Sequence, residues 1–486
     1  MNTYIGMDLG TSGLKMLLVT ADGTILAENT QTYPVSYPNP GWSEQNPEDW
    51  FAAALRGLEQ LLAGQDKSKV RGISFGGQMH GLVALDESDN VIRPAILWND
   101  GRTEEETQYL NEVIGKEKLS AWTGNIAFAG FTAPKLLWMK KHESENFAKI
   151  KKIMLPKDYL VYRLSGAFST DFSDASGMLL LDVKNRRWSR EMCDVCGISE
   201  QMLPELHESY EVVGMLKQEI ADKFGLKDVK IIAGAGDNAA AAVGTGVVGE
   251  GGCNISLGTS GTLFVSSSSY KEDKVNALHS FCHADGGWHL MGCILSAASC
   301  NSWWVNGILQ SADYKKEEDG LDEVIGQNDV YFLPYLMGER SPHNDVTARG
   351  SFIGMRPDTT RKIMTLAMLE GVTFALRDCL EAAKKNGAVI PRTKLCGGGA
   401  KSKLWRKIVA NVMNLPVDIP QTEQGPGFGA AMLAMVGCGE YISVQQAADA
   451  IVRIKETVLP DPEIAAQYEK RYHHFTKLYP ALKGLF

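Results

Sequence analysis

The sequence predicts an α/β protein built from two related halves. The string Leu-Gly-Thr-Ser-Gly occurs at Leu9–Gly13 and again at Leu257–Gly261, about half the chain length apart. Each copy lies between two apolar runs, which is the pattern of a β-hairpin. Because glycine permits open backbone angles, the N–H groups of such turns can point into one concavity and bind phosphate. Two such turns in matching halves predict two related domains that face each other across a polyphosphate.

The first half alternates apolar runs of strand length with segments of helical spacing. Pro47–Ala63 begins with a proline and carries apolar residues at helical spacing, so we predict a helix there. Val70–Phe75 and Val229–Ala233 are short apolar runs that end in glycine-rich turns, which predicts buried strands. The other elements predicted in this half are a strand at Leu82–Leu85 and helices at Thr132–Lys141 and Ala239–Val243.

The second half repeats this alternation after the glycine-rich segment Gly244–Gly252. We expect a hinge or boundary in that segment, and therefore two domains, residues 1–246 and 247–486. Strands that lead into glycine turns and then helices predict α/β layers in both halves. The elements predicted after the second hairpin are a helix at Ile294–Gly307, a loop at Gly338–His343, a helix at Thr359–Asn386, and a strand at Lys394–Cys396 that enters Gly397–Ala400.

Composition excludes several classes of function. Hydrophobic residues make up 44% of the chain and charged residues 22%, as in ordinary globular proteins. The net charge of −9 and the lack of a Lys/Arg block argue against a nucleic-acid partner. No apolar stretch is long enough to cross a bilayer, and the N-terminus leads into a predicted strand without the sections of a signal peptide. We therefore expect a cytoplasmic protein with no membrane partner.

The nine cysteines are scattered, which favours reduced and mostly buried thiols over a disulfide framework. Cys193 and Cys196 form a lone C-x-x-C without a second pair at zinc-finger spacing, so we expect neither a metal nor a redox role for them. His279, Cys282, His283 and His289 alternate with apolar residues and are interpreted as strand and hairpin positions.

An acidic residue precedes only the first of the two turns. Asp8 stands before the first Leu-Gly-Thr-Ser-Gly string, and Ser256 holds the matching place in the second. A carboxylate beside a phosphate site is repulsive unless a cation lies between them, and Mg²⁺ prefers oxygen ligands. We therefore predict that the first turn handles a metal and that the second mainly holds a nucleotide. The alternative is that Asp8 is an ordinary residue at a strand end.

Asp237 follows the predicted strand Val229–Ala233 and a bare glycine turn, and precedes an alanine-rich helix. The positive end of that helix favours the ionised form of the carboxyl group. A carboxylate at the mouth of a cleft can accept the proton of a sugar hydroxyl that attacks phosphorus. The alternative is a structural N-cap, for which aspartate is a common residue.

The same segment admits a second interpretation. Gly234, Gly236 and Ala239 have the spacing of a dinucleotide fingerprint after a strand. Against hydride transfer, Asp237 would place a negative charge beside the pyrophosphate, and no clear ribose-binding acid follows at the end of the next strand.

Two further glycine-framed segments are candidates for ligand contact. Gly76–Gly81 holds Gln78, Met79 and His80 at a strand end, where two hydrogen-bonding side chains and an adaptable apolar wall suit a small polyol. Gly397–Ala400 follows a strand, and its bare backbone could accommodate adenine or its ribose.

Taken together, these motifs resemble those of the FGGY carbohydrate kinases, and among them most closely the members that phosphorylate xylulose. The match is colinear over essentially the whole chain, and the discriminating pair is GQMHG with GDNAA. The segments that carry it are Tyr4–Lys15 (YIGMDLGTSGLK), Gly41–Gln45 (GWSEQ), Gly76–Gly81 (GGQMHG), Pro94–Arg102 (PAILWNDGR), Gly130–Trp138 (GFTAPKLLW), Leu155–Leu160 (LPKDYL), Gly234–Ala240 (GAGDNAA), Ser256–Gly261 (SLGTSG), Ser280–Ala284 (SFCHA), Leu295–Cys300 (LSAASC), Phe332–Asn344 and Gly397–Ala400.

The resemblance implies an actin-like ATPase fold, in which two ribonuclease-H-like domains face each other across a cleft that holds ATP and sugar. It implies that Asp237 is the catalytic base and that Asp8, together with Asp237, handles Mg²⁺. Lys403 lies where glycerol kinases carry an asparagine near the nucleotide, so its contact with adenine is left open. The implied sugar contacts are Gln78, Met79, His80, Asp237 and Asn238, and the implied nucleotide contacts are Gly10, Thr11, Ser12, Lys15, Gly258, Thr259, Ser260, Gly398, Gly399 and Ala400.

The function that the resemblance implies is ATP-dependent phosphorylation of D-xylulose to D-xylulose 5-phosphate, with Mg²⁺ as the cofactor. Two alternatives stay open at this point. One is a kinase for another ketose or polyol, such as ribulose, and the other is an actin-like ATPase without a sugar substrate. The expected partners are the sugar and ATP, and the sequence leaves the oligomeric state open, with a homodimer as one option.

Overall fold

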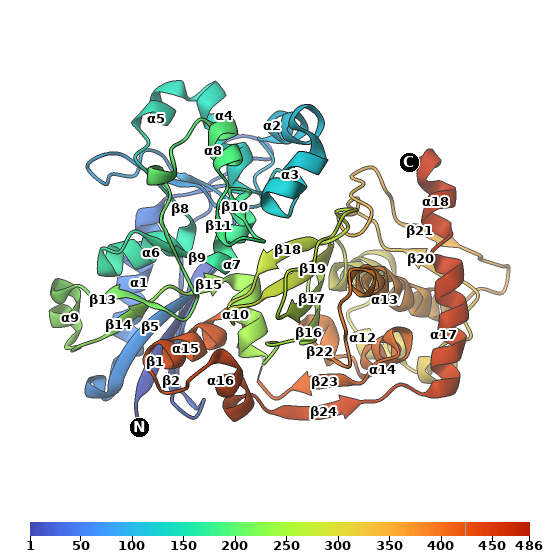
Figure 1. Cartoon of the computed structure of the whole chain (residues 1–486). Coiled ribbons are helices and arrows are strands. Elements are labelled where there is room, and N and C mark those ends of the chain that lie inside the picture. Colours follow the sequence, from blue (N-terminus) through green and yellow to red (C-terminus); the bar gives the residue numbers. More distant parts are fainter. Residues whose placement is uncertain (423) are drawn as a thin grey trace.

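Both copies of the repeated string form the turn of a β-hairpin, as predicted. In the computed structural model, which describes residues 1–422 and 424–486, β1 (Thr3–Leu9) pairs with β2 (Gly13–Thr20). In the second half, β16 (Cys253–Leu257) pairs with β17 (Gly261–Ser267). Each hairpin lies inside a seven-stranded sheet of its own, and the two sheets lie in the two halves of the molecule (Figure 1).

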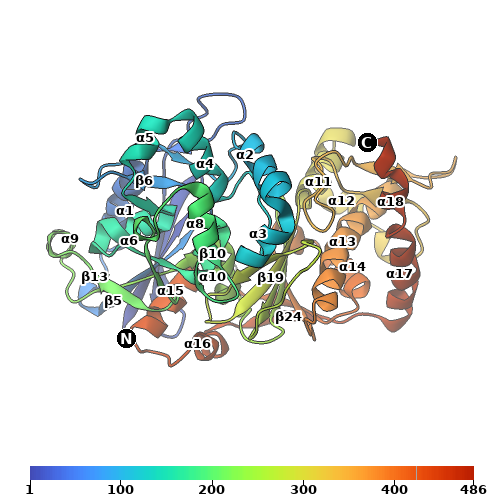
Figure 2. The same ribbon diagram turned by 45° about the horizontal axis from the view of Figure 1, so that its top comes forward.

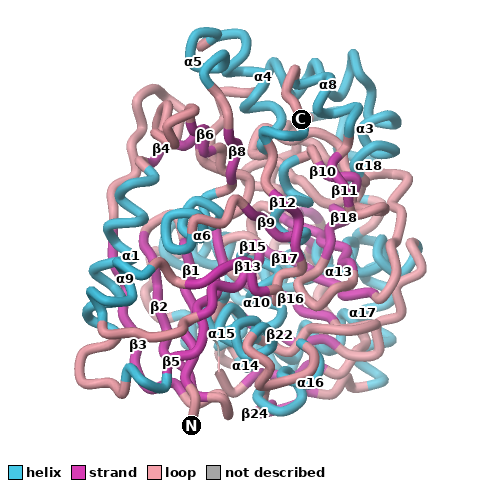
Figure 3. The backbone as a smooth tube through the Cα atoms, turned by 60° about the vertical axis from the view of Figure 1, so that its left-hand side comes forward, coloured by secondary structure: helices cyan, strands magenta, loops and turns pink. Residues whose placement is uncertain are grey.

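The two sheets share a common core topology. The first has the order β13-β14-β5-β1-β2-β3, with β15 also paired to β5, and the second has the order β18-β19-β17-β16-β22-β23-β24. In each, the first hairpin strand pairs in parallel with a later strand, β1 with β5 and β16 with β22. Figure 3 shows the strands of the first sheet running side by side. The remaining bounds are β3 Ile25–Thr32, β5 Val70–Gly77, β13 Val212–Met215, β14 Lys230–Ile232, β15 Ala235–Gly236, β18 His279–Cys282, β19 Trp288–Ile294, β22 Thr393–Cys396, β23 Val417–Pro420 and β24 Ile454–Val458.

Helices cover both faces of the first sheet, so its central strand β1 is buried on both sides. Ile5, Met7 and Leu9 pack toward α1 (Pro47–Leu61) and α6 (Pro156–Ser165). The alternate residues face α10 (Asp237–Gly244) and α15 (Pro426–Gly437), which contact each other. Because side chains alternate along a strand, Asp8 lies on the same face as Tyr4 and Gly6, toward α15.

Helix α15 comes from the second half of the sequence but packs on the first sheet (Figure 1). This contact is close because glycines meet backbone there. A methyl group on Gly6 would lie 1.8 Å from the Gly427 carbonyl oxygen, and one on Gly429 would lie 1.8 Å from that of Ala240. The two halves are therefore joined by a glycine-lined contact as well as by the segment Gly244–Gly252.

The second sheet packs against a helical layer at the other end of the molecule. Helix α13 (Arg361–Lys385) contacts α14 (Lys403–Met413), which in turn contacts α17 (Pro462–Phe475) (Figures 1 and 2). The indole of Trp405 is buried and donates a hydrogen bond to the Thr373 hydroxyl at 3.0 Å. One large apolar cluster joins these helices to the sheet.

The predicted helix at Ile294–Gly307 is wrong at its start. Strand β19 extends to Ile294, which pairs with Gly261. Helix α11 begins only at Ala298 and runs to Ser302, and a π-helical turn follows at Trp303–Ile308. The residues between them form a bend whose N–H groups bind the second hairpin turn.

Shorter elements complete the structure. No helix among residues 1–422 and 424–486 is both long enough and apolar enough to cross a membrane. The shorter strands and helices are β4 Glu44–Gln45, β6 Val83–Leu85, β7 Ala95–Ile96, β8 Lys152–Met154, β9 Ser169–Asp171, β10 Leu181–Asp182, β11 Arg187–Trp188, β12 Glu205–His207, β20 Tyr331–Leu333, β21 Ser351–Ile353, α2 Glu104–Gln108, α3 Lys116–Thr123, α4 Thr132–His142, α5 Ser144–Lys149, α7 Phe172–Ala175, α8 Arg190–Cys196, α9 Gln218–Phe224, α12 Tyr314–Glu318, α16 Val444–Ile451 and α18 Leu478–Leu482.

Candidate active site

The first hairpin turn is held in place by neighbouring loops. Gln45 Nε2 donates to the carbonyl oxygen of Thr11 at 2.7 Å, and Trp98 Nε1 donates to the Thr11 hydroxyl at 3.0 Å. Trp98 keeps 47% of its surface exposed. Ser12, at the tip of the turn, is exposed and open to a ligand.

Gln78, predicted as a sugar contact, is buried and binds this turn. Only 2% of its surface is exposed. Its Oε1 accepts a hydrogen bond from the Thr11 hydroxyl at 3.1 Å, and its Nε2 donates to Gln45 Oε1 at 3.0 Å. The oxygen and the nitrogen of the amide thus each bind one protein group. The sequence carries no signal of this, because Gln45 lies far from Gln78 along the chain.

The second turn, Gly258–Ser260, is bound by the start of α11. The N–H of Ala297 donates to the Thr259 carbonyl oxygen at 2.9 Å, and that of Ala298 donates to the Gly258 carbonyl oxygen at 2.8 Å. The hydroxyl of Ser299 adds a second hydrogen bond to the Thr259 carbonyl at 2.7 Å. With its carbonyls occupied, the turn presents hydroxyls and N–H groups, which suits an anion.

A groove begins at this turn and continues within the second half. A cavity of about 690 Å³ is lined by Gly258, Thr259 and the start of α11, and a second of about 780 Å³ lies beside it. The two share Ala298 and Gly398, so they form one continuous groove. A methyl group on Gly398 would meet no atom within 4 Å, which leaves the backbone there open to a ligand.

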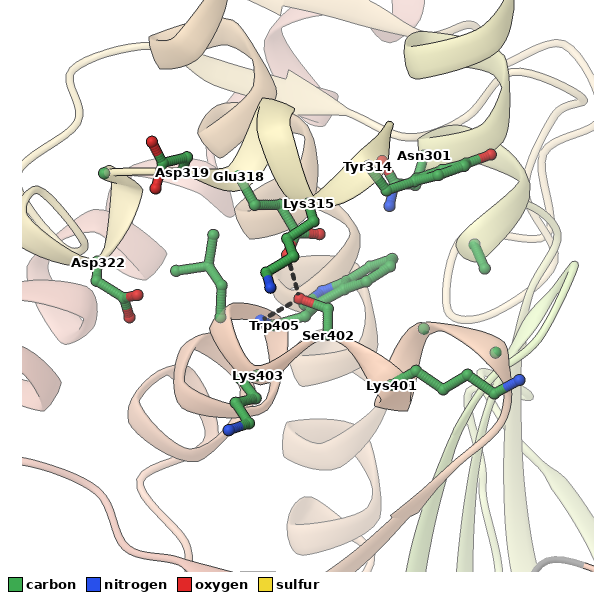
Figure 4. A pocket seen from close by; sticks show the side chains of 15 residues that line it. Asn301, Tyr314, Lys315, Glu318, Asp319, Asp322, Lys401, Ser402, Lys403 and Trp405 are labelled. Carbon is green, nitrogen blue, oxygen red and sulfur yellow. Dashed lines mark hydrogen bonds between the residues drawn. The ribbon is translucent and has the colours of Figure 1, made fainter. Parts of the chain in front are cut away.

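The larger cavity is lined by polar and charged side chains and by the aromatic residues Tyr314 and Trp405 (Figure 4). Ser402 donates to Glu318 Oε2 at 2.6 Å and accepts the backbone N–H of Trp405 at 3.0 Å. The side chains of Lys401 and Lys403 both line the cavity but extend in different directions (Figure 4). Predicted residues Gly398 and Gly399 lie here, and Ala400 is buried directly behind them.

In the first half, Asp8 and Asp237 are close enough for their charges to interact. Burial and the charge of Asp237 together raise the pKa of Asp8 to about 7, against the opposing charge of Lys15. Burial also raises the pKa of Asp237 to about 6, against the stabilising N–H of Asn238. Asp237 Oδ1 accepts that N–H at 2.7 Å and Asn238 Nδ2 at 3.0 Å. Asp237 Oδ2 accepts no hydrogen bond from residues 1–422 and 424–486. It is therefore free to accept a proton.

Asp237 is not the cap of its helix. Gly236 occupies the N-cap position of α10, and Asp237 is the first helical residue. Its carboxylate accepts the backbone N–H of the next residue, Asn238. A capping side chain would instead accept the N–H of the second or third residue after it. Asp237 therefore does not make the hydrogen bonds of a structural N-cap.

The donor set of Asp8 and Asp237 fits Mg²⁺. Carboxylate oxygens are ligands that this ion prefers, and a cation would relieve the repulsion that raises the Asp8 pKa. Mg²⁺ keeps several waters and binds phosphate oxygens, so it needs few protein ligands. Within the described ranges 1–422 and 424–486, no group of three or more acidic, histidine or cysteine side chains is arranged to hold a metal.

Lys15, predicted as a nucleotide contact, lies directly across the hairpin from Asp8. Its Nζ donates to Gln424 Oε1 at 2.6 Å and lies 3.7 Å from the Glu28 carboxylate. The side chain therefore reaches the residues that precede α15, and its charge acts on Asp8.

The predicted sugar residues gather beside Asp237. Asn238 Nδ2 lies 3.9 Å from Met79 Sδ. A methyl group on Gly236 would lie 3.0 Å from that sulfur, so the glycine leaves room for Met79. A methyl group on Gly177 would lie 2.4 Å from the His80 ring and 3.2 Å from Met79 Cε. Met79 therefore lies next to Asn238, and His80 and Met79 both pack against Gly177.

His80 is fixed at both its backbone and its ring. Its φ of 71° is unusual for a residue with a side chain, and its carbonyl oxygen accepts hydrogen bonds from Thr132 Oγ1 at 3.0 Å and Lys135 Nζ at 2.8 Å. Nδ1 lies 2.8 Å from the Gly177 carbonyl oxygen, which assigns the proton to Nδ1 and leaves Nε2 as an acceptor. Burial, with Lys135 nearby, lowers the pKa of His80 to about 3, so the ring is neutral.

A buried ionic network supports Asp237 from behind, and sequence reasoning missed it. Lys157 is fully buried and lies 2.8 Å from Asp171 and 3.7 Å from Asp174. Asp171 accepts the Ser173 hydroxyl at 2.5 Å, and that hydroxyl accepts the backbone N–H of Gly236 at 3.1 Å. A chain of hydrogen bonds thus ends at the residue before Asp237. Leu155–Leu160 was recognised only as part of a resemblance, because its partners are distant in sequence.

The predicted site residues form two groups in the structure. Those of the first half surround Asp8 and Asp237, and those of the second half line the groove at Gly258 and Gly398. Among the residues that the structure describes, no hydrogen bond links the two groups.

Two family models match the chain, the N-terminal domain of the FGGY family of carbohydrate kinases at residues 3–244 and its C-terminal domain at residues 253–438. The xylulose kinase of Escherichia coli (strain K12) is 40% identical over 486 residues, and the alignment covers 99% of each protein. The solved structure of a xyloylose kinase from Brucella ovis is 40% identical, covers 100% of both chains and superposes with a TM-score of 0.95. A gluconate kinase from Lactobacillus acidophilus is 28% identical, covers 99% of this chain and 98% of its own, and has a TM-score of 0.94.

These matches confirm the predicted two-domain α/β architecture with an actin-like ATPase fold. The matches argue against an enzyme that transfers hydride and against an actin-like ATPase without a sugar substrate. The chain belongs to the FGGY family of carbohydrate kinases and is a sugar kinase, a phosphotransferase with an alcohol group as acceptor.

Proposed function

We propose that this kinase phosphorylates D-xylulose to D-xylulose 5-phosphate with ATP as the donor. The observation that carries the proposal is the full-length similarity to a xylulose kinase at 40% identity. The cluster of Met79, His80, Asp237 and Asn238 supports it, because these side chains offer a small polar site for a sugar. The two domains are proposed to be residues 1–246 and 247–486.

Asp237 acts as the general base in this proposal. Its Oδ1 is held by Asn238, and Oδ2 accepts the proton of the terminal hydroxyl. The hydroxyl oxygen forms a bond to the γ-phosphorus of ATP while the bond from that phosphorus to the bridging oxygen breaks, and ADP leaves. With a pKa of about 6, the carboxyl group is mostly ionised at neutral pH and still basic enough to take a proton.

The remaining residues hold and orient the substrates. Asp8 and Asp237 would hold Mg²⁺, which when bound neutralises charge on the phosphate oxygens. The turns at Gly10–Ser12 and Gly258–Ser260 would bind phosphate through N–H groups and hydroxyls, and the groove at Gly398–Ala400 would bind the nucleoside. Gln78 positions the first turn through Thr11.

A second candidate is a kinase for another sugar. It is favoured by the gluconate kinase from Lactobacillus acidophilus, which has almost the same fold as this chain. Sugar pockets of this kind discriminate through a few hydrogen bonds, so the fold alone does not identify the substrate.

A coupled assay of ADP release tests the proposal. The purified protein is supplied with Mg²⁺-ATP and either no sugar, D-xylulose, other pentuloses, gluconate or glycerol. We expect the highest kcat/KM for D-xylulose and a product that is phosphorylated at the terminal carbon by ³¹P NMR. If another sugar has a higher kcat/KM than D-xylulose, that sugar is the preferred substrate and the proposed substrate is wrong.

A further inference from the structure

An arginine from the second half packs on the aromatic cluster that contacts His80. Arg340 lies in the loop between β20 and β21, and its guanidinium carbon is 5.2 Å from the centre of the Phe128 ring. Phe128 packs 5.4 Å from Phe131, which lies 4.6 Å from the His80 ring. The Arg340 charge also acts on His80, whose pKa is lowered first by burial, then by Lys135 and then by this arginine.

Arg340 differs from the other partly buried arginines of the chain. Arg93, Arg102, Arg377 and Arg471 each donate to a carboxylate. In residues 1–422 and 424–486, no oxygen accepts a hydrogen bond or an ion pair from the Arg340 guanidinium, which lies over the Phe128 ring.

The neighbouring acid does not pair with Arg340. Glu339 is buried, and its Oε1 accepts the backbone N–H groups of Leu295 at 2.9 Å and of Arg340 itself at 2.8 Å. Burial raises the pKa of Glu339 to about 8, against these hydrogen bonds and the Arg340 charge. The guanidinium therefore keeps its donors available for a ligand that lies beyond the Phe128 ring.

The chemistry of a ketose identifies what these donors would bind. Arginine has five N–H donors and no acceptor, so it pairs only with an acceptor oxygen. The hydroxyl groups of a sugar both donate and accept, whereas its ketone oxygen only accepts. His80 Nε2 is an acceptor and suits a hydroxyl, so the two side chains are complementary.

The proposed reaction also requires a free ketone. A 2-ketopentose can close a five-membered ring only by adding its terminal hydroxyl to the ketone. That hydroxyl is the attacking group, so it must be free when phosphate is transferred. The bound sugar is therefore in the open-chain form, with its carbonyl oxygen exposed to a donor.

We propose that Arg340 hydrogen-bonds the ketone oxygen of the sugar and thereby selects ketoses over the corresponding polyols. The inference rests on the proposed function in that it takes a ketose as the substrate. It makes the loop between β20 and β21 part of the sugar site and gives the second half a role in substrate choice.

Arg340→Met tests this inference, because methionine keeps an apolar stem against Phe128 and removes every donor. We expect kcat/KM for D-xylulose to fall by about 10- to 100-fold, mainly through KM, as for a lost hydrogen bond to a charged group. The dissociation constant of D-arabinitol, which has a hydroxyl in place of the ketone, should change little by calorimetry. Arg340→Lys should recover part of the loss, because lysine supplies a charged donor.

Arg349→Met is the matched control. Arg349 is exposed in the same loop and donates to the carbonyl oxygens of Val346 and Ala348. This variant should keep the kinetics of the unsubstituted enzyme. Equal losses for ketose and polyol in Arg340→Met, or no loss for either, would overturn the inference.

The same experiment separates the inference from the proposed function. If the unsubstituted enzyme prefers another ketose to D-xylulose, the proposed substrate is wrong, and the comparison is made with that ketose and its polyol. If it prefers a polyol to every ketose, the role of Arg340 is overturned as well.

Discussion

At the scale of single residues, the proposed reaction depends on Asp237 Oδ2, which accepts no hydrogen bond from the residues that the structure describes. Asp237→Asn keeps the size of the side chain but removes its basicity, so we expect kcat to fall by about 10²- to 10⁴-fold, as for the loss of a positioned general base. The coupled ADP assay with saturating D-xylulose measures this change in kcat. Asp194→Asn, at an exposed position on α8, is the matched control and should keep full activity. Retention of kcat in Asp237→Asn would contradict the role of Asp237.

The raised pKa of Asp8 predicts how metal affinity depends on pH. Burial and the charge of Asp237 raise the pKa of Asp8 from 3.8 to about 7, so its protonated form is abundant at pH 6 and scarce at pH 8. A proton and Mg²⁺ compete for the same carboxylate, so raising the pH should strengthen binding. Calorimetric titration of Mg²⁺ into the protein at pH 6, 7 and 8 measures the trend. In Asp8→Asn both the affinity and its pH dependence should be reduced, and a pH-independent affinity in the native protein would count against the proposed ligand.

At the scale of elements, the position of Asp237 depends on how closely α10 and α15 pack. A methyl group on Gly429 would lie 1.8 Å from the Ala240 carbonyl oxygen, which belongs to the helix that Asp237 begins. Gly429→Ala should therefore lower the free energy of unfolding by about 1–3 kcal/mol, as overpacking does, despite the better helix propensity of alanine.

Equilibrium unfolding in urea, combined with kcat, measures the effect of Gly429→Ala. Gly307→Ala is the control, because a methyl group there would approach no atom closer than 3.8 Å. We expect Gly307→Ala to have native stability and Gly429→Ala to lose both stability and activity. An unchanged stability of Gly429→Ala would show that the two helices separate without cost.

Local patterns predicted most of the elements and few of the contacts between them. The hairpins, α1, α13 and the strands that precede Gly76 and Gly397 follow from apolar spacing and glycine turns, because those signals lie within a few residues. The start of α11 was misjudged because β19 pairs with β17, and nothing in residues 294–297 shows that partner.

In the candidate site, local patterns again account for single residues and not for the contacts between them. Asp8, Asp237, Met79 and His80 stand beside glycine turns at strand ends, which is a local signal. The support of Asp237 by Ser173, the burial of Gln78 against Gln45, and the approach of Arg340 to Phe128 all join distant segments. Such contacts arise from topology, so no pattern in one segment predicts them.

At the scale of the whole molecule, the two groups of candidate site residues lie on different halves, and the proposed reaction transfers phosphate between them. Sites of this kind close to exclude water from the donor. We expect that D-xylulose together with a non-hydrolysable ATP analogue brings the halves closer and lowers the radius of gyration in small-angle X-ray scattering. The movement would occur about the segment Gly244–Gly252 and the glycine contact of α15. Identical profiles with and without both ligands would contradict closure.

A crystal structure of the protein with D-xylulose, Mg²⁺ and a non-hydrolysable ATP analogue tests the central claim most directly. We predict that Asp237 Oδ2 lies within hydrogen-bond distance of the terminal sugar hydroxyl, and that this hydroxyl faces the γ-phosphorus in line with the bond that breaks. A complex in which the Asp237 carboxylate is remote from that hydroxyl would contradict the account.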